Sequence, residues 1–295
     1  MGLVENSLAP PTRFDLNFRV GDIPVRVHPF FWLTTVLLGL NIFQEGNPAS
    51  KAFPEFGIWV VIVFVSILVH ELGHVLMGRY FGSRGHIILT GFCGLAVGSA
   101  EQRQRWQRIL VSLAGPGAGF LFAGLITGGI CVYSPSFALY LLASLIHVPV
   151  AFPDAVPSPL VVFTLYTALW LNIFWGLVNL LPIWPLDGGQ VSREICEAYK
   201  GRDGQRLSLW ISLFTAAGFA VVALIEVVMK KPLVPYLSFG TSLFAALFFA
   251  LLALSNWQLL RFLQRAGSEW EEHNEPRAPW EQDPDWWKRG GDPWD

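Results

Sequence analysis

The sequence predicts an all-α polytopic membrane protein of about six transmembrane helices, with a short β-type or re-entrant segment between helices two and three. The composition supports this fold class, because 53% of the 295 residues are hydrophobic and only 14% are charged. Runs without Asp, Glu, Lys or Arg, such as Ile109–Pro153 and Ala155–Leu186, exceed the length of about 20 residues that one membrane-spanning helix needs. Basic residues also gather in alternate connections, as in chains that cross a membrane repeatedly.

Charged residues, prolines and glycines divide the apolar runs into six helices. These helices are expected at residues 28–43, 56–81, 107–133, 160–184, 207–229 and 236–262. Together they form a six-helix membrane domain over residues 28–262. Residues 1–27 precede it as an N-terminal segment.

The distribution of Lys and Arg predicts the orientation of the chain. The basic connections lie at 1–27, at 79–108, at 193–206 and after Arg261, whereas the intervening ones hold Lys51, then no basic residue in 134–159, then Lys230 and Lys231. Because basic connections of membrane proteins face the cytoplasm, we expect both termini to be cytoplasmic.

Two segments do not fit the pattern of spanning helices. Phe137–Phe152 is apolar but short, and counting it as a span would move the basic 193–206 connection to the outside. We therefore expect an interfacial or re-entrant piece on the outer face. Gly82–Gly98 is rich in glycine and contains short β-type runs, which predicts a hairpin or a loop that dips into the membrane.

The C-terminal segment 263–295 differs in composition from the rest of the chain. From Gln264 onward it holds nine acidic residues, four basic residues and five tryptophans. Such a segment buries little apolar surface, so we expect a flexible acidic tail. Alternatively, its tryptophans rest at the level of the lipid headgroups.

Charge and cysteine content exclude some classes of protein. The net charge of −2 argues against nucleic acid as a partner, because a binder needs a basic face to neutralise phosphates. Cys93, Cys131 and Cys196 are far apart and form no CxxC pair, so they indicate neither a disulfide framework nor a thiolate zinc site. Nothing in the sequence indicates an oligomeric state.

The second expected helix carries polar residues that lipid would not accommodate. His70, Glu71 and His74 spell HELGH, which places two imidazoles one turn apart on one helical face, with the carboxylate beside them. Two neutral imidazoles can take two of the four positions around one Zn²⁺ ion, and the glutamate can accept a proton from a zinc-bound water. Buried polar residues satisfied by neighbouring helices are the alternative, although ionisable residues within a span are typical of a functional site.

Asp187 is the best candidate for a third ligand. It lies in NLLPIWPLDGG, Asn179–Gly189, at the end of the fourth expected span, and the orientation above places it in the same cytoplasmic leaflet as His70 and His74. The prolines disfavour helix and the glycines permit tight turning, so Asp187 is expected on unwound chain. A turn that simply ends the helix explains the same residues.

These residues resemble the site-2 protease family of intramembrane zinc metalloproteases. The family combines HExxH with an N-x-x-P-x-x-x-L-D-G motif, which Asn179, Pro182, Leu186, Asp187 and Gly188 match. LAGPGAG at Leu113–Gly119 is similar to the third family signature, although many members carry Asn where this chain has Gly119. The resemblance covers approximately residues 19–261.

The resemblance implies a zinc metalloendopeptidase with one zinc ion held by His70, His74 and Asp187, and with Glu71 as catalytic base. Its substrate would be a single-span, membrane-anchored regulatory protein in the lipid bilayer, cut in or near the transmembrane segment at the cytoplasmic side. Asn179 is expected to donate a hydrogen bond to the substrate backbone or to the developing oxyanion.

A helical substrate must unwind locally before its peptide bond can be cut. We therefore expect an edge strand to hold it, and His86, Ile87, Ile88 and Leu89 are the candidate residues for pairing with the extended substrate.

Two other functions remain open. A metal-ion transporter or sensor would also place His and Asp within the membrane, but it has no special need for Glu71. The third hypothesis is a catalytically silent scaffold with the same fold.

Overall fold

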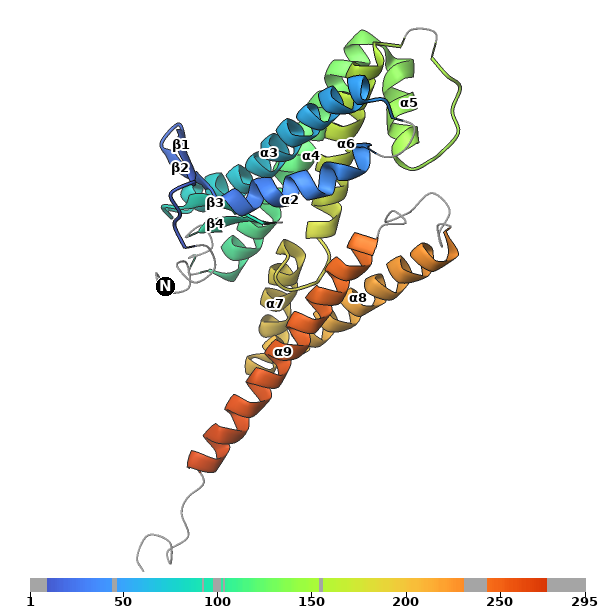
Figure 1. Cartoon of the computed structure of the whole chain (residues 1–295). Helices are drawn as coiled ribbons and strands as arrows, with labels where there is room; N and C mark the ends of the chain where they lie inside the picture. The colour runs from blue at the N-terminus through green and yellow to red at the C-terminus, as the bar shows by residue number, and fades with distance from the viewer. Residues whose placement is uncertain are drawn as a thin grey trace, which may run out of the picture.

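The computed structural model describes residues 10–43, 47–91, 93–97, 102, 104–153, 156–230 and 243–274. Figure 1 shows a small sheet at one end of a group of helices that contains α3, α4 and α6. A second group, made of α7, α8 and α9, lies beyond the end of α6, and α5 lies at the end opposite the sheet. The catalytic candidates come from α3 and from the start of α7, so their meeting point lies between these two groups.

The sheet contains four strands in the order β1-β2-β3-β4. Two of them come from the N-terminal segment, and the other two confirm the hairpin expected within Gly82–Gly98. β1 pairs antiparallel with β2, β2 pairs parallel with β3, and β3 pairs antiparallel with β4. The strands are β1 (Leu16–Val20), β2 (Ile23–Val27), β3 (His86–Thr90) and β4 (Cys93–Val97).

The sheet packs against the helices through its apolar residues. Val25, Val27, Ile87 and Leu89 are buried and belong to one hydrophobic cluster with residues of α3. Alternate residues of β2 therefore face the helices, as the two-residue period of a strand requires. Arg79, near the end of α3, also forms an ion pair with Asp22 in the β1–β2 turn. These contacts fix the sheet beside the half of α3 that carries the HELGH motif.

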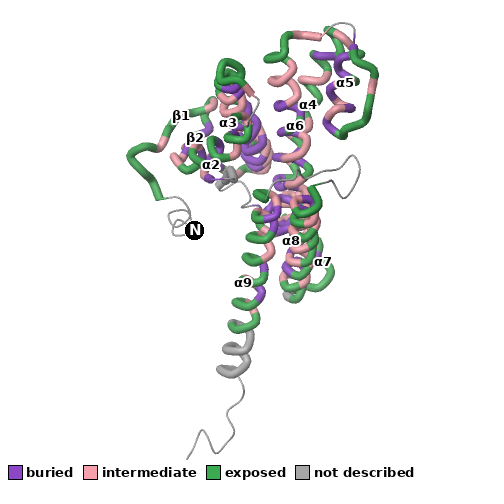
Figure 2. The backbone as a smooth tube through the Cα atoms, turned by 45° about the vertical axis from the view of Figure 1, so that its right-hand side comes forward, coloured by how far each residue is buried: buried purple, intermediate pink, exposed green. Residues whose placement is uncertain are grey.

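Five of the described helices are long and apolar enough to cross a membrane. They are α3 (Ala49–Tyr80), α4 (Arg105–Tyr133), α6 (Pro159–Asn179), α8 (Arg202–Met229) and α9 (Leu243–Asn274). Many of their outward-facing residues are apolar and exposed, including Leu121, Leu125, Leu251 and Leu254, which suits contact with lipid. Figure 2 shows this exposure along much of α9. The polytopic helical fold predicted from the sequence is thereby confirmed.

The first expected span, 28–43, is shorter than the other five. It consists of α2 (Pro29–Gly39) and the 3₁₀ turn η1 (Leu40–Phe43). The helix begins after His28 because Pro29 suits the first helical position, and because Nδ1 of His28 accepts a hydrogen bond from the Phe30 amide. Together the two elements form an apolar helix below the length of a full span.

Several helix ends differ from the expected ones, among them the start of α8 at Arg202 instead of 207, and local residues explain two of them. α3 begins at Ala49 and includes Pro54; Glu55 accepts a hydrogen bond from Asn47 at 3.1 Å, which ties the added turns to the preceding loop. α6 ends at Asn179, before 184, because the prolines that follow lack the backbone donor a helix needs. α9 continues to Asn274, past the expected limit of 262.

Two short helices complete the described chain. α5 (Pro135–Leu145) overlaps the first part of the expected interfacial segment Phe137–Phe152, and it is too short to span a membrane. α7 (Asp187–Lys200) was not expected from the sequence. The acidic, tryptophan-rich part of the tail from residue 275 onward lies outside the described residues.

Candidate metal centre

His70 and His74 lie one turn apart on α3, as the HELGH spacing predicts. Both are buried, with 4% and 6% of their surface exposed, and their Nε2 atoms are 3.2 Å apart. The surrounding span is apolar, so two adjacent polar rings lie where water is scarce. This arrangement brings two metal-ligating atoms to one point on the helix face.

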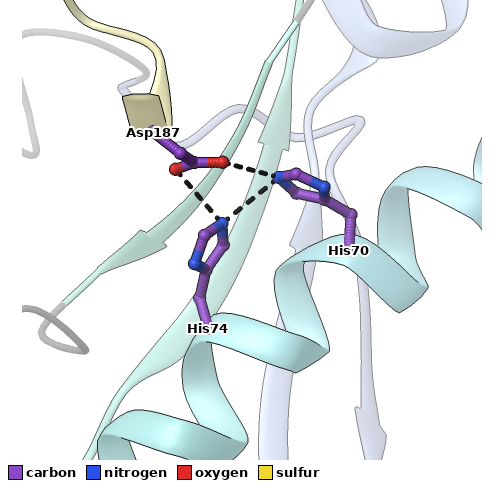
Figure 3. A group of neighbouring side chains, drawn as sticks. All are labelled: His70, His74 and Asp187. Carbon is purple, nitrogen blue, oxygen red and sulfur yellow. Dashed lines mark hydrogen bonds and ion pairs between the residues drawn. The ribbon is translucent and has the colours of Figure 1, made fainter. Parts of the chain in front are cut away.

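Asp187, the first residue of α7, reaches both histidines. Its Oδ2 atom lies 3.2 Å from Nε2 of His70, and its Oδ1 atom lies 3.3 Å from Nε2 of His74. Figure 3 shows the three side chains turned toward one another from α3 and from the start of α7. The two sequence elements therefore converge, although they are more than a hundred residues apart.

The glycines after Asp187 explain how the backbone reaches this position. A Cβ atom at Gly188 would overlap the carbonyl groups of Leu180 and Leu181, and one at Gly189 would overlap the backbone of Ile183 and Trp184. Only residues without a side chain permit this close approach. The LDGG sequence thus packs directly against the chain that leaves α6.

The distances fit a single tetrahedral zinc ion. Zinc bound at about 2.0–2.1 Å by nitrogen or oxygen places neighbouring ligand atoms about 3.3–3.4 Å apart. Here the two Nε2 atoms are 3.2 Å apart, and they lie 3.2 and 3.3 Å from the two different oxygens of the Asp187 carboxylate. Asp187 Oδ2 is buried and accepts no hydrogen bond from the described residues, which is costly unless a cation is bound. In the described part of the chain, His70, His74 and Asp187 form the group of three residues able to hold a metal.

The hydrogen bond of His74 fixes which nitrogen is free for a metal. Its Nδ1 atom lies 2.7 Å from the carbonyl oxygen of Val111 in α4. A carbonyl only accepts hydrogen bonds, so Nδ1 carries the proton and Nε2 of the neutral ring keeps its lone pair. Such a partner behind a metal-ligating histidine fixes the orientation of the ring.

The charge state of Asp187 also suits a metal ligand. Burial alone would raise the pKa of its carboxyl group, but the His74 and His70 rings, when they are protonated in the metal-free site, outweigh burial and hold this pKa well below its ordinary value. Asp187 is therefore an ionised carboxylate, which is the form that binds cations.

Glu71 follows His70 on α3 and is also buried, with 4% of its surface exposed. Its position in the same helical turn as the two histidines agrees with a carboxylate that acts beside the metal rather than as one of the three ligands.

The contact between Gly115 and His74 explains one of the glycines in the LAGPGAG segment. A Cβ atom at Gly115 in α4 would overlap Nε2 and Cε1 of His74, so a side chain at this position is incompatible with the observed ring. At Gly119 a Cβ atom would lie 3.4 Å from the Asn172 carbonyl oxygen. Because glycine has no side chain, residue 119 cannot supply the polar group that Asn supplies in many family members.

Asn179 lies at the end of α6 and is buried. Its Nδ2 atom donates to the carbonyl oxygen of Trp175 at 2.9 Å, which uses one of the two N–H groups of the amide. The expected contact of Asn179 with substrate therefore depends on its remaining N–H group or on its oxygen.

The sheet contradicts the expected role of His86–Leu89 as an edge strand. These residues form most of β3, which pairs with β2 on one side and with β4 on the other. Ile87, Ile88 and Leu89 are paired on both sides, so β3 does not offer a substrate strand the free edge that was expected. The error arose because the pairing of β3 with the distant β2 is not visible in the local sequence.

Several residues that position the site were not anticipated from the sequence. Arg108 in α4 donates to Glu194 in α7 through Nε at 2.6 Å and Nη2 at 2.7 Å, which docks the helix that begins at Asp187. Ser212 in α8 and Asn256 in α9 contact the loop before Asp187. Ser212 and Asn256 are polar residues within apolar spans, and this is the signal in the sequence by which they could have been found.

Comparison with known proteins places this site in a family. The sequence profile of peptidase family M50 matches residues 58–223, more than half of the chain. The Synechocystis protein sll0528, which carries the name of a zinc metalloprotease, is 29% identical over 222 residues, or 70% of this chain and 51% of that protein. Zinc metalloprotease MJ0392 of Methanocaldococcus jannaschii is 26% identical over 180 residues, or 60% of this chain and 44% of that protein.

The chain therefore spans about half the length of the curated relatives it matches. Among solved structures, a site-2 protease from Methanocaldococcus jannaschii aligns with 22% identity and a TM-score of 0.48, over 83% of this chain and 94% of that one.

Proposed function

The chain belongs to peptidase family M50, the site-2 protease family, and on this basis we propose that it is an intramembrane zinc metalloprotease. It is a multi-pass membrane protein whose apolar helices lie in a lipid bilayer. The proposed reaction is hydrolysis of a peptide bond in or near the transmembrane segment of a membrane-anchored protein.

The observation that carries this proposal is the convergence of His70, His74 and Asp187. The buried Nε2 atoms of His70 and His74 lie 3.2 Å apart, and each lies within 3.3 Å of an oxygen of the buried Asp187 carboxylate, which comes from a distant element. A catalytic zinc site has three protein ligands and keeps its fourth position open. The family supports zinc as the metal.

When bound, zinc lowers the pKa of a water in its coordination shell and polarises a substrate carbonyl. Glu71 accepts the proton of the attacking water and passes it to the leaving amine. The Val111 carbonyl holds the His74 ring in position, and the docking of α7 on α4 holds Asp187. Asn179 donates its remaining N–H group to the substrate carbonyl as negative charge develops on that oxygen.

Substrate binding is assigned to β4, at the edge of the sheet. Residues 93–97 pair with β3 on one side only in the part of the sheet that the structure describes. An unwound substrate segment pairs with the other edge by strand addition, since main-chain hydrogen bonds bind many sequences in extended form. Specificity would then depend on the side chains that flank the scissile bond.

The proposed substrate is a single-span membrane protein. A reporter protein with one transmembrane segment can represent it in an assay. The basic residues in connections 79–108 and 193–206 support a cytoplasmic location of both termini. HELGH and Asp187 lie toward those same connections, so we place the cut near the cytoplasmic leaflet.

The test uses purified full-length protein with such a reporter. Glu71→Gln should keep about one zinc per chain and lose cleavage, because it removes the proton acceptor and leaves the ligands. His70→Ala and Asp187→Asn should bind zinc more weakly. Cleavage by Glu71→Gln at the wild-type rate, or zinc transport into liposomes without cleavage, would refute the proposal.

A further inference from the structure

The backbone of Trp184, three residues before Asp187, is held by the two C-terminal helices. Its N–H group donates to Oγ of Ser212 in α8 at 3.0 Å. Its carbonyl oxygen accepts from Nδ2 of Asn256 in α9 at 2.7 Å. The backbone donor and the backbone acceptor of this one residue are thus paired with side chains from two different helices.

Both side chains are oriented for this purpose. Ser212 and Asn256 are 1% and 0% exposed. The Ser212 hydroxyl donates to the Ser208 carbonyl at 2.8 Å, so its lone pairs are available to the Trp184 N–H group. Nδ2 of Asn256 also donates to the Leu252 carbonyl at 2.8 Å.

The amide of Asn256 keeps this orientation although it leaves an acceptor unused. Its Oδ1 atom is buried and accepts no hydrogen bond from the described residues. An unsatisfied buried acceptor is unfavourable, and in an apolar span a leucine would avoid it. The hydrogen bond to the Trp184 carbonyl oxygen is the favourable contact that asparagine makes at this position and that leucine could not make.

The loop transmits the position of Trp184 to Asp187. The Leu186 N–H group donates to the Ile183 carbonyl at 2.8 Å, and Gly189 packs against the backbone of Ile183 and Trp184. This short turn contains Pro185, which restricts the backbone further. A displacement of the Trp184 backbone therefore moves the Asp187 carboxylate.

We infer that Ser212 and Asn256 are positioning residues, which hold the backbone of Trp184 so that Asp187 meets His70 and His74. The inference rests on the proposed zinc site. It assigns to α8 and α9, which contribute none of the three ligand side chains, a direct part in completing the metal centre. The affinity for zinc then depends on how these two helices sit against the loop.

The experiment measures zinc affinity of the purified full-length protein by competition with a chelator. Ser212→Ala and Asn256→Leu should each weaken zinc binding about tenfold, as loss of supporting contacts around metal ligands does. Ser208→Ala is the matched control on α8, because Ser208 is buried and its hydroxyl donates only to the Gln205 carbonyl in its own helix. Ser255→Ala is the control on α9.

A second readout separates positioning from general stability. With Co²⁺ in place of zinc, the visible absorption reports the ligand geometry, and it should change in Ser212→Ala and Asn256→Leu but not in the controls. Ser212→Thr keeps the hydroxyl and should restore wild-type affinity and spectrum. If Ser212→Ala does not purify as a folded protein, Ser212→Cys, of similar volume but weaker hydrogen bonding, replaces it.

Zinc affinity and Co²⁺ spectra equal to those of the controls would overturn the inference. His70→Ala serves as the reference for the metal site itself. If His70→Ala binds zinc like the wild type, the proposed function fails; if His70→Ala loses zinc while Ser212→Ala and Asn256→Leu do not, only the positioning role fails.

Discussion

Gly115 in α4 lies so close to the imidazole ring of His74 in α3 that a Cβ atom at residue 115 would overlap Nε2, the atom that faces Asp187. The opposite nitrogen of the ring is fixed by the Val111 carbonyl. One helix therefore fixes His74 in two ways, by a hydrogen bond to one nitrogen and by the absence of a side chain beside the other.

Replacement of Gly115 by alanine should abolish high-affinity zinc binding. The added methyl group displaces the His74 ring from the position at which it meets Asp187, and overpacking of this kind costs about 1–3 kcal/mol. Zinc content of the purified variant checks the prediction. Gly117→Ala is the control, because a Cβ atom there has no neighbour within 4 Å; equal zinc loss in both variants would contradict the explanation.

Gly73→Ala should separate α3 from α4. A Cβ atom at Gly73 would overlap the Ala114 carbonyl oxygen and lie 2.8 Å from the Cβ atom of Ala118, and small residues allow this close approach of membrane helices. We expect a lower thermal unfolding midpoint in detergent and a loss of zinc. A Cβ atom at Gly57, in the same helix, has no neighbour within 4 Å, so Gly57→Ala should leave the unfolding midpoint and the zinc content unchanged. A midpoint for Gly73→Ala equal to that of Gly57→Ala would show that the helices tolerate the methyl group.

The metal-site candidates could be predicted because each belongs to a compact local motif. HELGH places two imidazoles on one helical face whatever surrounds the helix. The prolines before Asp187 indicate the unwound chain that precedes it, but Asp187 itself, expected on that unwound chain, is the first residue of α7. The role of Gly115 could not be predicted from spacing, since nothing in the local sequence says which ring a glycine on another helix will face.

Strands β1 and β2 and helix α7 were missed for different reasons. β1 and β2 lie in a charged N-terminal segment, and β3, the second partner of β2, follows about sixty residues later, so the four-stranded sheet depends on long-range contacts. α7 is polar and begins directly after a Pro- and Gly-rich turn, and no apolar run indicates it. The same long-range pairing made β3 an interior strand and thereby contradicted the expected substrate edge at His86–Leu89.

Arg108→Lys should weaken the docking of α7 on α4. The guanidinium of Arg108 makes two hydrogen bonds to the Glu194 carboxylate, and a lysine ammonium cannot reproduce this paired geometry. We expect a loss of about 1 kcal/mol in unfolding free energy, the upper end for partly exposed ion pairs, and weaker zinc binding.

Arg105→Lys is the matched control for this ion pair. Nε of Arg105 lies 3.5 Å from Oε2 of Glu194. Arg105→Lys should therefore lower the unfolding free energy and the zinc affinity less than Arg108→Lys does. If Arg105→Lys costs as much as Arg108→Lys, the paired geometry is not what docks the helix.

Removal of zinc should destabilise the folded protein. A ligand that binds only the folded state stabilises it by about 2.7 kcal/mol at a concentration one hundred times its dissociation constant. A chelator should therefore lower the unfolding midpoint, and added Zn²⁺ should restore it, whereas Mg²⁺ should not because it prefers all-oxygen sites. The unfolding midpoint of His70→Ala should not change when chelator is added. A decrease equal to that of the wild type would place the stabilising metal elsewhere.

The most direct test of the central claim, that His70, His74 and Asp187 hold one zinc ion, is X-ray absorption at the zinc edge of the purified protein. The account predicts one zinc per chain with nitrogen and oxygen ligands at about 2.0–2.1 Å, imidazole scattering from two histidines, and the loss of one imidazole in His74→Ala. Sulfur ligands at about 2.3 Å, or a spectrum that His74→Ala leaves unchanged, would contradict it.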